Sequence, residues 1–197
     1  MKNIILSILW ILFLASVSFA QDLGLKLANG VVYGGKSPLS NGFGGSCTYI
    51  SPDTSKSLIF EANNSFQQVV YSRKVTNSFY VGPTGGLLDN AVWLAPIFIF
   101  NPFKKISLIS WNGLYFGEPG RPDWKTNFAF AYHAIDISLG NFVLSYSILH
   151  FMMEVPMNIP TIKYSLKVNK KDYLIFSASY HIRDDKPMFF MSWLRGF

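Results

Sequence analysis

The residues of this chain best suited to acid–base chemistry are its three histidines, and one of them lies near small hydroxyl side chains. The segment from Asn127 to Ile135 carries His133, and the segment from Asn141 to His150 carries Ser145 and Ser147. If these segments are neighbouring strands, side chains facing each other across them come within about 5 Å. His133 could then act as a base toward Ser147, as in a nucleophilic acyl hydrolase.

The sequence around this pair argues against that chemistry. A hydrolase also needs a carboxylate that orients the imidazole, and Asp136 follows His133 by three residues, which puts it on the other face of a strand. The chain has no Gly-rich phosphate loop, HExxH motif, paired-cysteine spacing or GxSxG elbow, so we predict neither a metal nor a cofactor. The simpler interpretation is that His133 and Ser147 are hydrogen-bonded polar residues inside a barrel.

Alternation with a period of two residues predicts the strands that would position these side chains. In Thr161 to Asn169, Tyr164 and Leu166 lie on a bulky apolar face and Lys163 on a polar one. Three other segments, including those with His133 and Ser147, divide in the same way. We expect the bulky faces to meet lipid, which turns the polar faces into a lumen. Besides His133 and Ser147, the expected lumen-lining residues are Ser145, Lys163, Ser165, Lys167, Ser177, Ser179 and His181.

The lysines on the polar face leave two possibilities open. A lumen lined by Lys163 and Lys167 would favour anions, as rings of basic side chains do in anion-selective pores. Alternatively, they pair with inward carboxylates such as Asp172 or Glu61 and fill a narrow barrel.

Turn-forming residues separate the strand segments in a regular way. Short and long connections alternate along the chain, which is typical of membrane barrels with short periplasmic turns and longer outer loops. The pattern gives about twelve strands, or about eight to ten if weak segments between Ser57 and Val81 are merged. We therefore predict an all-β fold, a closed antiparallel up-and-down transmembrane β-barrel of about 8–12 strands. One expected outer loop, Gly117 to Trp124, holds two prolines and two glycines, which predict a fixed shape. Arg121 and Trp124 are its expected contact residues, and the loop would either bind a surface ligand or cap the barrel mouth.

The N-terminus predicts the compartment. Lys2 is followed by an apolar run from Ile4 to Val17 and by small residues at Ser18 and Ala20, as in a secretory signal peptide. We predict that residues 1–20 are a cleaved signal and that residues 21–197 form the exported barrel domain. The residue after the predicted cut is Gln21 rather than cysteine, so a lipoprotein is not expected.

The composition agrees with a membrane barrel. Charged residues make up 14% of the chain, against about 25% in soluble domains. Aromatic residues make up 17%, which suits the aromatic girdles and lipid face of a barrel. The net charge of +6 comes with no nucleic-acid-binding module, so nucleic acid is not an expected partner. The expected partners of a membrane barrel are a lipid bilayer and lipopolysaccharide.

The C-terminal segment carries a further pattern. Phe189, Met191, Trp193 and Phe197 alternate on one face, and the chain stops at Phe197. This resembles the outer-membrane β-barrel class, whose last strand ends in an aromatic residue read by the assembly machinery. The resemblance implies that Phe189, Trp193 and Phe197 form an assembly signal and that the barrel resides in the outer membrane. Arg195 departs from the pattern, since an apolar or aromatic residue is expected there.

The sequence leaves three hypotheses for the function open. The first is a non-enzymatic outer-membrane barrel with a structural, adhesive or small-solute role. The second is a barrel-embedded lipid-modifying hydrolase that uses His133 and Ser147. The third is a soluble exported β-barrel that binds an apolar ligand inside.

Overall fold

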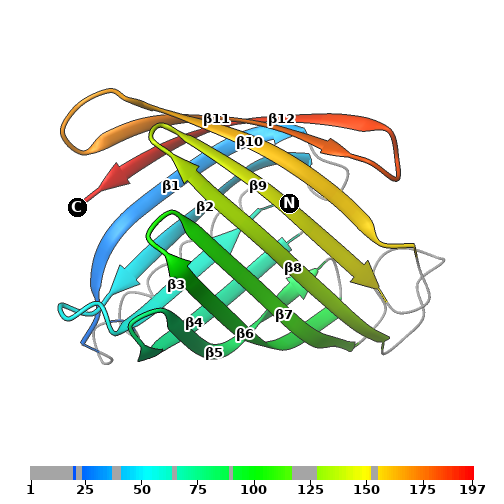
Figure 1. The fold of residues 1–197 in the computed structure, drawn as a ribbon, viewed down its shortest axis with the longest axis horizontal. Helices are drawn as coiled ribbons and strands as arrows, with labels where there is room; N and C mark the ends of the chain where they lie inside the picture. Colours follow the sequence, from blue (N-terminus) through cyan, green and yellow to red (C-terminus); the bar gives the residue numbers. More distant parts are fainter. Residues whose placement is uncertain are drawn as a thin grey trace, which may run out of the picture.

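Twelve antiparallel strands form a closed barrel in the computed structural model, in which the last strand pairs with the first (Figure 1). This confirms the predicted fold, with the larger of the predicted strand numbers. Within the described part of the chain, no helix is long and apolar enough to cross a membrane. The structure describes Ala20 and residues 24–36, 41–63, 66–88, 91–116, 128–151 and 155–197.

The strands follow the chain order around the barrel, so each one pairs with its neighbours in sequence. This is the meander expected when consecutive strands are joined by short hairpins. Their bounds are β1 Lys26–Lys36, β2 Asn41–Ile50, β3 Lys56–Ala62, β4 Phe66–Thr76, β5 Phe79–Leu88, β6 Ala91–Phe103, β7 Ile106–Phe116, β8 Phe128–Leu139, β9 Phe142–Phe151, β10 Met157–Lys167, β11 Asp172–His181 and β12 Lys186–Gly196.

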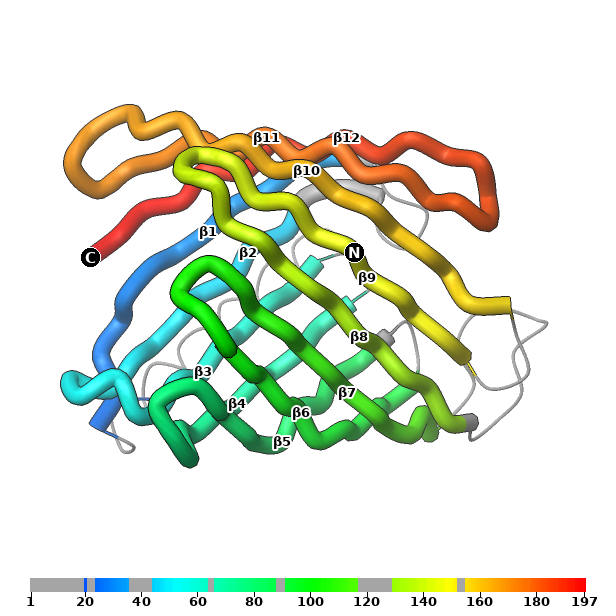
Figure 2. The backbone as a smooth tube through the Cα atoms, viewed as in Figure 1, coloured from blue at the N-terminus to red at the C-terminus, as the bar shows by residue number. Residues whose placement is uncertain are grey.

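The barrel has two distinct rims. The first, called here the turn end, carries the C-terminus and the hairpin connections such as residues 104–105 and 140–141 (Figures 1 and 2). Gly140 has a φ of 65°, which suits a tight two-residue hairpin. The opposite rim, called the loop end, carries the longest connection, residues 117–127. This asymmetry matches the alternation of connections in the sequence.

Two glycine-rich stretches, Gly34-Gly35 and Gly82 to Gly86, lie within strands rather than in the connections between them. β1 continues through Lys36, and β5 continues through Leu88. At Gly82 and Gly86 an added Cβ would lie 1.9 and 1.8 Å from carbonyl oxygens of β4. These glycines therefore allow two strands to approach closely, which is why they lie inside a strand rather than in a turn.

Burial alternates along the strands and identifies the two faces of the sheet. In β6, Trp93 and Ile97 are buried, whereas Leu94 and Phe98 are exposed. Residues directly opposite each other on paired strands share a face, so the register carries this assignment around the barrel. The outer surface is a band of exposed apolar side chains, as a barrel in lipid requires. Its members include Leu94, Phe98, Leu108, Leu114, Leu144, Ile162, Leu166, Phe176, Phe189 and Met191.

The expected facing is right for β9, β10 and β11 but wrong for β8. Phe130 and Ala134 of β8 are buried, and Phe130 lies opposite the inward-facing Phe151. The bulky residues of β8 therefore point into the barrel, while His133 is exposed on the outside. The bulky residues of β8 face inward because small side chains alone cannot fill the lumen of a twelve-stranded barrel, and aromatic rings fill part of it.

Candidate functional site

A cavity of about 370 Å³ lies in the lumen toward the loop end. We call it the loop-end cavity. Its lining residues come from strands all around the barrel, and most of them fall into two groups by chemistry, with Leu149, Phe151 and Phe190 completing the lining. The aromatic wall consists of Phe66, Trp93, Trp111, Tyr115, Phe130 and Tyr132. The polar wall consists of Tyr33, Glu61, Asn63 and Gln68.

The aromatic wall is a continuous packed layer built from β4, β6, β7 and β8. Trp93, only 1% exposed, stacks on Phe66 with centroids 5.9 Å apart and on Trp111 with centroids 5.6 Å apart. Phe130 meets the Trp93 ring edge-on, with an interplanar angle of 87°. Tyr132 packs on Trp111 with centroids 5.0 Å apart. The stacked and edge-on pairs around Trp93 have the preferred geometries of aromatic pairs, so the wall is stabilised by its own contacts.

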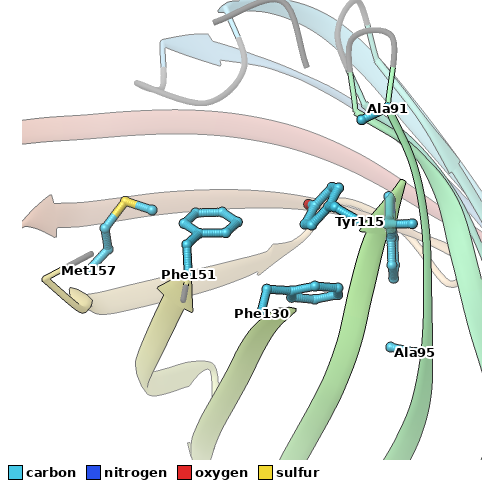
Figure 3. Close-up of a cluster of buried hydrophobic side chains, with 7 residues drawn as sticks. Ala91, Ala95, Tyr115, Phe130, Phe151 and Met157 are labelled. Carbon is cyan, nitrogen blue, oxygen red and sulfur yellow. The ribbon is translucent and has the colours of Figure 1, made fainter. Parts of the chain in front are cut away.

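Figure 3 shows the loop-end part of this layer. Tyr115, Phe130 and Phe151 project from three consecutive strands toward one another, with Met157 beyond Phe151 (Figure 3). The small side chains of Ala91 and Ala95 on β6 leave room for the rings. Small and large residues thus alternate across the lumen.

Glycines placed opposite the rings provide the remaining space. Gly113 is the cross-strand partner of Phe130, and a Cβ on Gly113 would lie 2.6 Å from the Phe130 ring. Gly44 has the same relationship to Tyr33, at 2.7 Å. Gly86 lies opposite Trp93. Large inward rings can fold over these positions because glycine has no side chain.

Hydrogen bonds hold the polar wall in position. The Tyr33 hydroxyl donates to Glu61 Oε1 at 2.9 Å, and Gln68 Nε2 donates to Glu61 Oε2 at 2.6 Å. Asn63 Nδ2 donates to the Tyr33 hydroxyl at 3.4 Å. Among the described residues, Glu61 has no salt-bridge partner and is the only charged residue lining the cavity. The cavity is therefore acidic.

Three polar atoms of the lining residues are buried without a hydrogen-bond partner within the described structure. They are the indole nitrogens Nε1 of Trp93 and Trp111 and the amide oxygen Oε1 of Gln68. Buried polar groups are nearly always paired in folded proteins, and leaving one unpaired costs about 1–3 kcal/mol. All three atoms are enclosed by neighbouring side chains, so they lie within the wall rather than at the surface of the cavity.

The lumen toward the turn end is lined by small hydroxyl and charged side chains. Ser145 donates a hydrogen bond to Asp136, and the hydroxyls of Thr161 and Ser179 lie 2.8 Å apart. Lys163 lies opposite Ser177, with no salt-bridge partner in the described structure. The register places all the remaining residues expected in the lumen on inward-facing positions: Ser145, Ser147, Lys163, Ser165, Lys167, Ser177, Ser179 and His181.

The structure does not bring His133 and Ser147 together. Ser147 lies opposite Ala134 and faces inward, whereas His133 lies opposite Ile148 and faces outward. Instead, His133 Nδ1 lies 3.0 Å from the hydroxyl of Ser110 on β7, and Asn112 donates to the same hydroxyl at 3.2 Å. The predicted contact is wrong because it assumed that the bulky face of β8 meets lipid. The described residues contain no group of three or more His, Cys, Asp and Glu able to hold a metal.

The other expected carboxylate partners of the lysines are engaged elsewhere. Asp172 lies on the outer face of the barrel, opposite Arg195, and Glu61 bonds Tyr33 and Gln68. Neither pairs with Lys163 or Lys167. The lysines therefore do not plug the lumen through these carboxylates.

The C-terminal aromatic residues lie on the outer surface. Phe189, Trp193 and Phe197 are 66%, 48% and 62% exposed, so the aromatic side chains of this segment point outward. The Phe197 N–H donates to the Ala28 carbonyl at 3.0 Å, beyond the last paired residues of β12 and β1. Residues 117–127, with the predicted contact residues Arg121 and Trp124, lie outside the described structure.

Sequence reasoning missed the aromatic wall and the polar wall. Trp93 and Trp111 were not singled out, although the glycines opposite the rings gave a signal. Adjacent glycines within a strand pattern, such as Gly85-Gly86, indicate that another group comes close to the backbone there. A bulky side chain on the neighbouring strand is one such group. Glu61 was named only as a possible lysine partner.

Comparisons with known proteins agree with the fold. No protein-family model and no curated protein matches the chain. Among solved structures, the barrel resembles a KdgM porin, with a TM-score of 0.57 and 12% identity over 87% of this chain and 99% of the porin. It also resembles a KdgM porin in complex with disordered oligogalacturonate, with a TM-score of 0.56 and 13% identity over 87% and 99% of the two chains. At this level of identity, what is shared is the twelve-stranded porin fold.

Proposed function

We propose that this chain is a porin-like channel of the outer membrane that lets small solutes cross through the barrel lumen. The observation that carries the proposal is the interior. A purely structural barrel would fill its centre, whereas this one combines an open cavity with a lumen lined by hydroxyl groups toward the turn end. A soluble barrel would not carry a band of exposed apolar side chains around its outer face. A twelve-stranded barrel is intermediate between small filled barrels and wide porins, which fits a narrow, selective passage.

The outer surface supports the membrane location. Exposed apolar side chains such as Leu144, Ile162 and Phe176 would face acyl chains rather than water. The loop end would face outward, and the turn end with the C-terminus would face the periplasm. The loop-end cavity then lies at the outer entrance, where it meets solutes first. Lipopolysaccharide would surround this half of the barrel.

Thiol labelling in a planar lipid bilayer tests the channel. In a Cys47→Ser background, Ser177→Cys places a thiol on the lumen side opposite Lys163, and Ala178→Cys places one on the lipid side of the same strand. A water-soluble cationic thiol reagent should reduce the ionic current through Ser177→Cys and leave Ala178→Cys unchanged. Absence of ionic current from the folded protein, or equal block of both variants, would overturn the proposal.

Export forms a separate part of the proposal. Residues 1–20 would direct secretion and be removed after Ala20, because the apolar run ends just before two small residues. Intact-mass measurement of the protein isolated from membranes should show a chain that begins at Gln21. Retention of Met1 in that material would contradict cleavage.

A further inference from the structure

The two walls of the loop-end cavity have complementary chemistry that defines a class of ligand. One wall is a layer of aromatic rings anchored by Trp93 and Trp111, and the other presents Glu61 and Gln68. A molecule that fills the space must therefore offer an apolar surface on one side and hydrogen-bonding groups on the other. Small-molecule sites commonly combine aromatic walls with a few fixed polar groups in this way.

The polar wall shows which hydrogen bonds the ligand can make. The carboxylate of Glu61 can only accept, so it requires donors from the ligand in addition to those of Tyr33 and Gln68. The hydroxyl groups of a polyhydroxylated ring supply such donors, and the C–H faces of the ring can lie against aromatic rings.

The charge of the cavity restricts the ligand further. Glu61 is fixed by Tyr33 and Gln68, and no lysine or arginine of the described structure lines the cavity. An anionic ligand would meet this carboxylate without a compensating cation, and like charges in a partly desolvated site repel strongly. On the described strands, both arginines, Arg73 and Arg195, occupy outward-facing positions.

From these features we infer that the loop-end cavity is a binding site for an uncharged saccharide ring, and that it discriminates against acidic saccharides. The inference rests on the proposed channel function and specifies its solute class. Glu61 accepts hydrogen bonds from sugar hydroxyls, and the aromatic wall contacts the apolar face of the ring. The KdgM porin that this barrel resembles was solved in complex with oligogalacturonate, which is an acidic saccharide. The two lumens would therefore differ in selectivity.

Binding is measured on the folded protein by isothermal titration calorimetry, with maltotriose, trigalacturonate and choline as neutral, acidic and cationic probes. The inference predicts that maltotriose binds and that trigalacturonate binds at least about tenfold more weakly. Equal or tighter binding of trigalacturonate would overturn it. A response to choline without one to maltotriose would identify a cation site and would also overturn it.

Variants test the role of each wall. Trp111→Ala should weaken maltotriose binding by about tenfold, because it removes a buried aromatic anchor. Trp111→Phe keeps a flat ring and should retain part of the binding, which guards against a general loss of folding. Leu114→Ala, on the outer face of the same strand, is the matched control and should bind as the unchanged protein does. Normal binding by Trp111→Ala would overturn the assignment of the aromatic wall.

The carboxylate is tested by its effect on selectivity. Glu61→Gln should reduce the preference for maltotriose over trigalacturonate, because the repulsion of the acidic sugar disappears. Asp136→Asn removes a lumen carboxylate outside the cavity and should leave that preference unchanged. If both variants behave alike, the discrimination does not arise at Glu61 and the inference fails.

The two proposals fail in different ways. Ionic current without maltotriose binding would overturn the saccharide site and support the channel. Maltotriose binding without ionic current would support the site and overturn the channel.

Discussion

Asp172 and Arg195 lie directly opposite each other on β11 and β12, with carboxylate Oδ1 3.9 Å from guanidinium Nε. The indole N–H of Trp193 donates to the same carboxylate oxygen at 3.3 Å. A charged residue beside a carboxylate thus occupies position 195, where the outer-membrane barrel pattern expects an apolar one. Arg195 lies at the turn end of the barrel, where its charge can reach water or lipid headgroups.

We expect the two members of this pair to differ in their contribution to stability. Asp172 also binds the Asn169 side chain and Trp193, whereas the Arg195 side chain is 60% exposed. Asp172→Ala should therefore lower the urea concentration at the unfolding midpoint in lipid vesicles, and Arg195→Leu should leave it nearly unchanged. An equal loss in both variants would mean that the ion pair, rather than the hydrogen bonds of Asp172, provides the stability.

The terminal residue should affect assembly more than stability. The Phe197 ring is exposed, so Phe197→Ala should change the free energy of unfolding by no more than about 1 kcal/mol. If the ring is read by the assembly machinery, the same variant should show a reduced folded, heat-modifiable fraction in cells while export continues. Deletion of Phe197 also removes its backbone hydrogen bond to Ala28, worth about 1 kcal/mol. Normal assembly of both variants would contradict an assembly signal.

Charge placement on β10 tests which face meets lipid. Ile162 is exposed near the middle of the strand, so Ile162→Arg should cost about 2–4 kcal/mol of folding free energy in vesicles. Leu166 lies close to the turn end, and Leu166→Arg should cost about 0–1 kcal/mol because the penalty falls with depth. Ser165→Arg, on the inward face, is the control and should be tolerated. A larger loss at Ser165 than at Ile162 would reverse the assignment of faces.

His133 should be dispensable. It lies on the lipid side of β8, bonded to Ser110, so His133→Leu replaces a polar group by an apolar one at an apolar surface. We expect unchanged or slightly higher stability in the vesicle unfolding assay, and unchanged ionic current. A loss of more than about 1 kcal/mol would show that the Ser110–His133 hydrogen bond stabilises the barrel, contrary to this expectation.

Local patterns in the sequence predicted the strands well. The segment from Thr161 to Asn169, which alternates with a period of two, contains the second half of β10. The period-two segments of β9, β10 and β11 have the facing that their patterns suggested. Alternation is a property of neighbouring residues, so it can be read from a single strand.

The sequence by itself determined that this chain alternates two unlike faces along about a dozen strands, closed by hairpins and ending in an aromatic strand. It did not determine which face of β8 points inward, because alternation is unchanged when a strand is rotated by half a turn. In the tertiary structure Gly113 of β7 lies across from Phe130 of β8 and leaves space for this ring on the inward side. The tertiary structure alone decided that the rings from four strands meet Glu61 and Gln68 across one cavity, because cross-barrel contacts join residues that are distant in sequence.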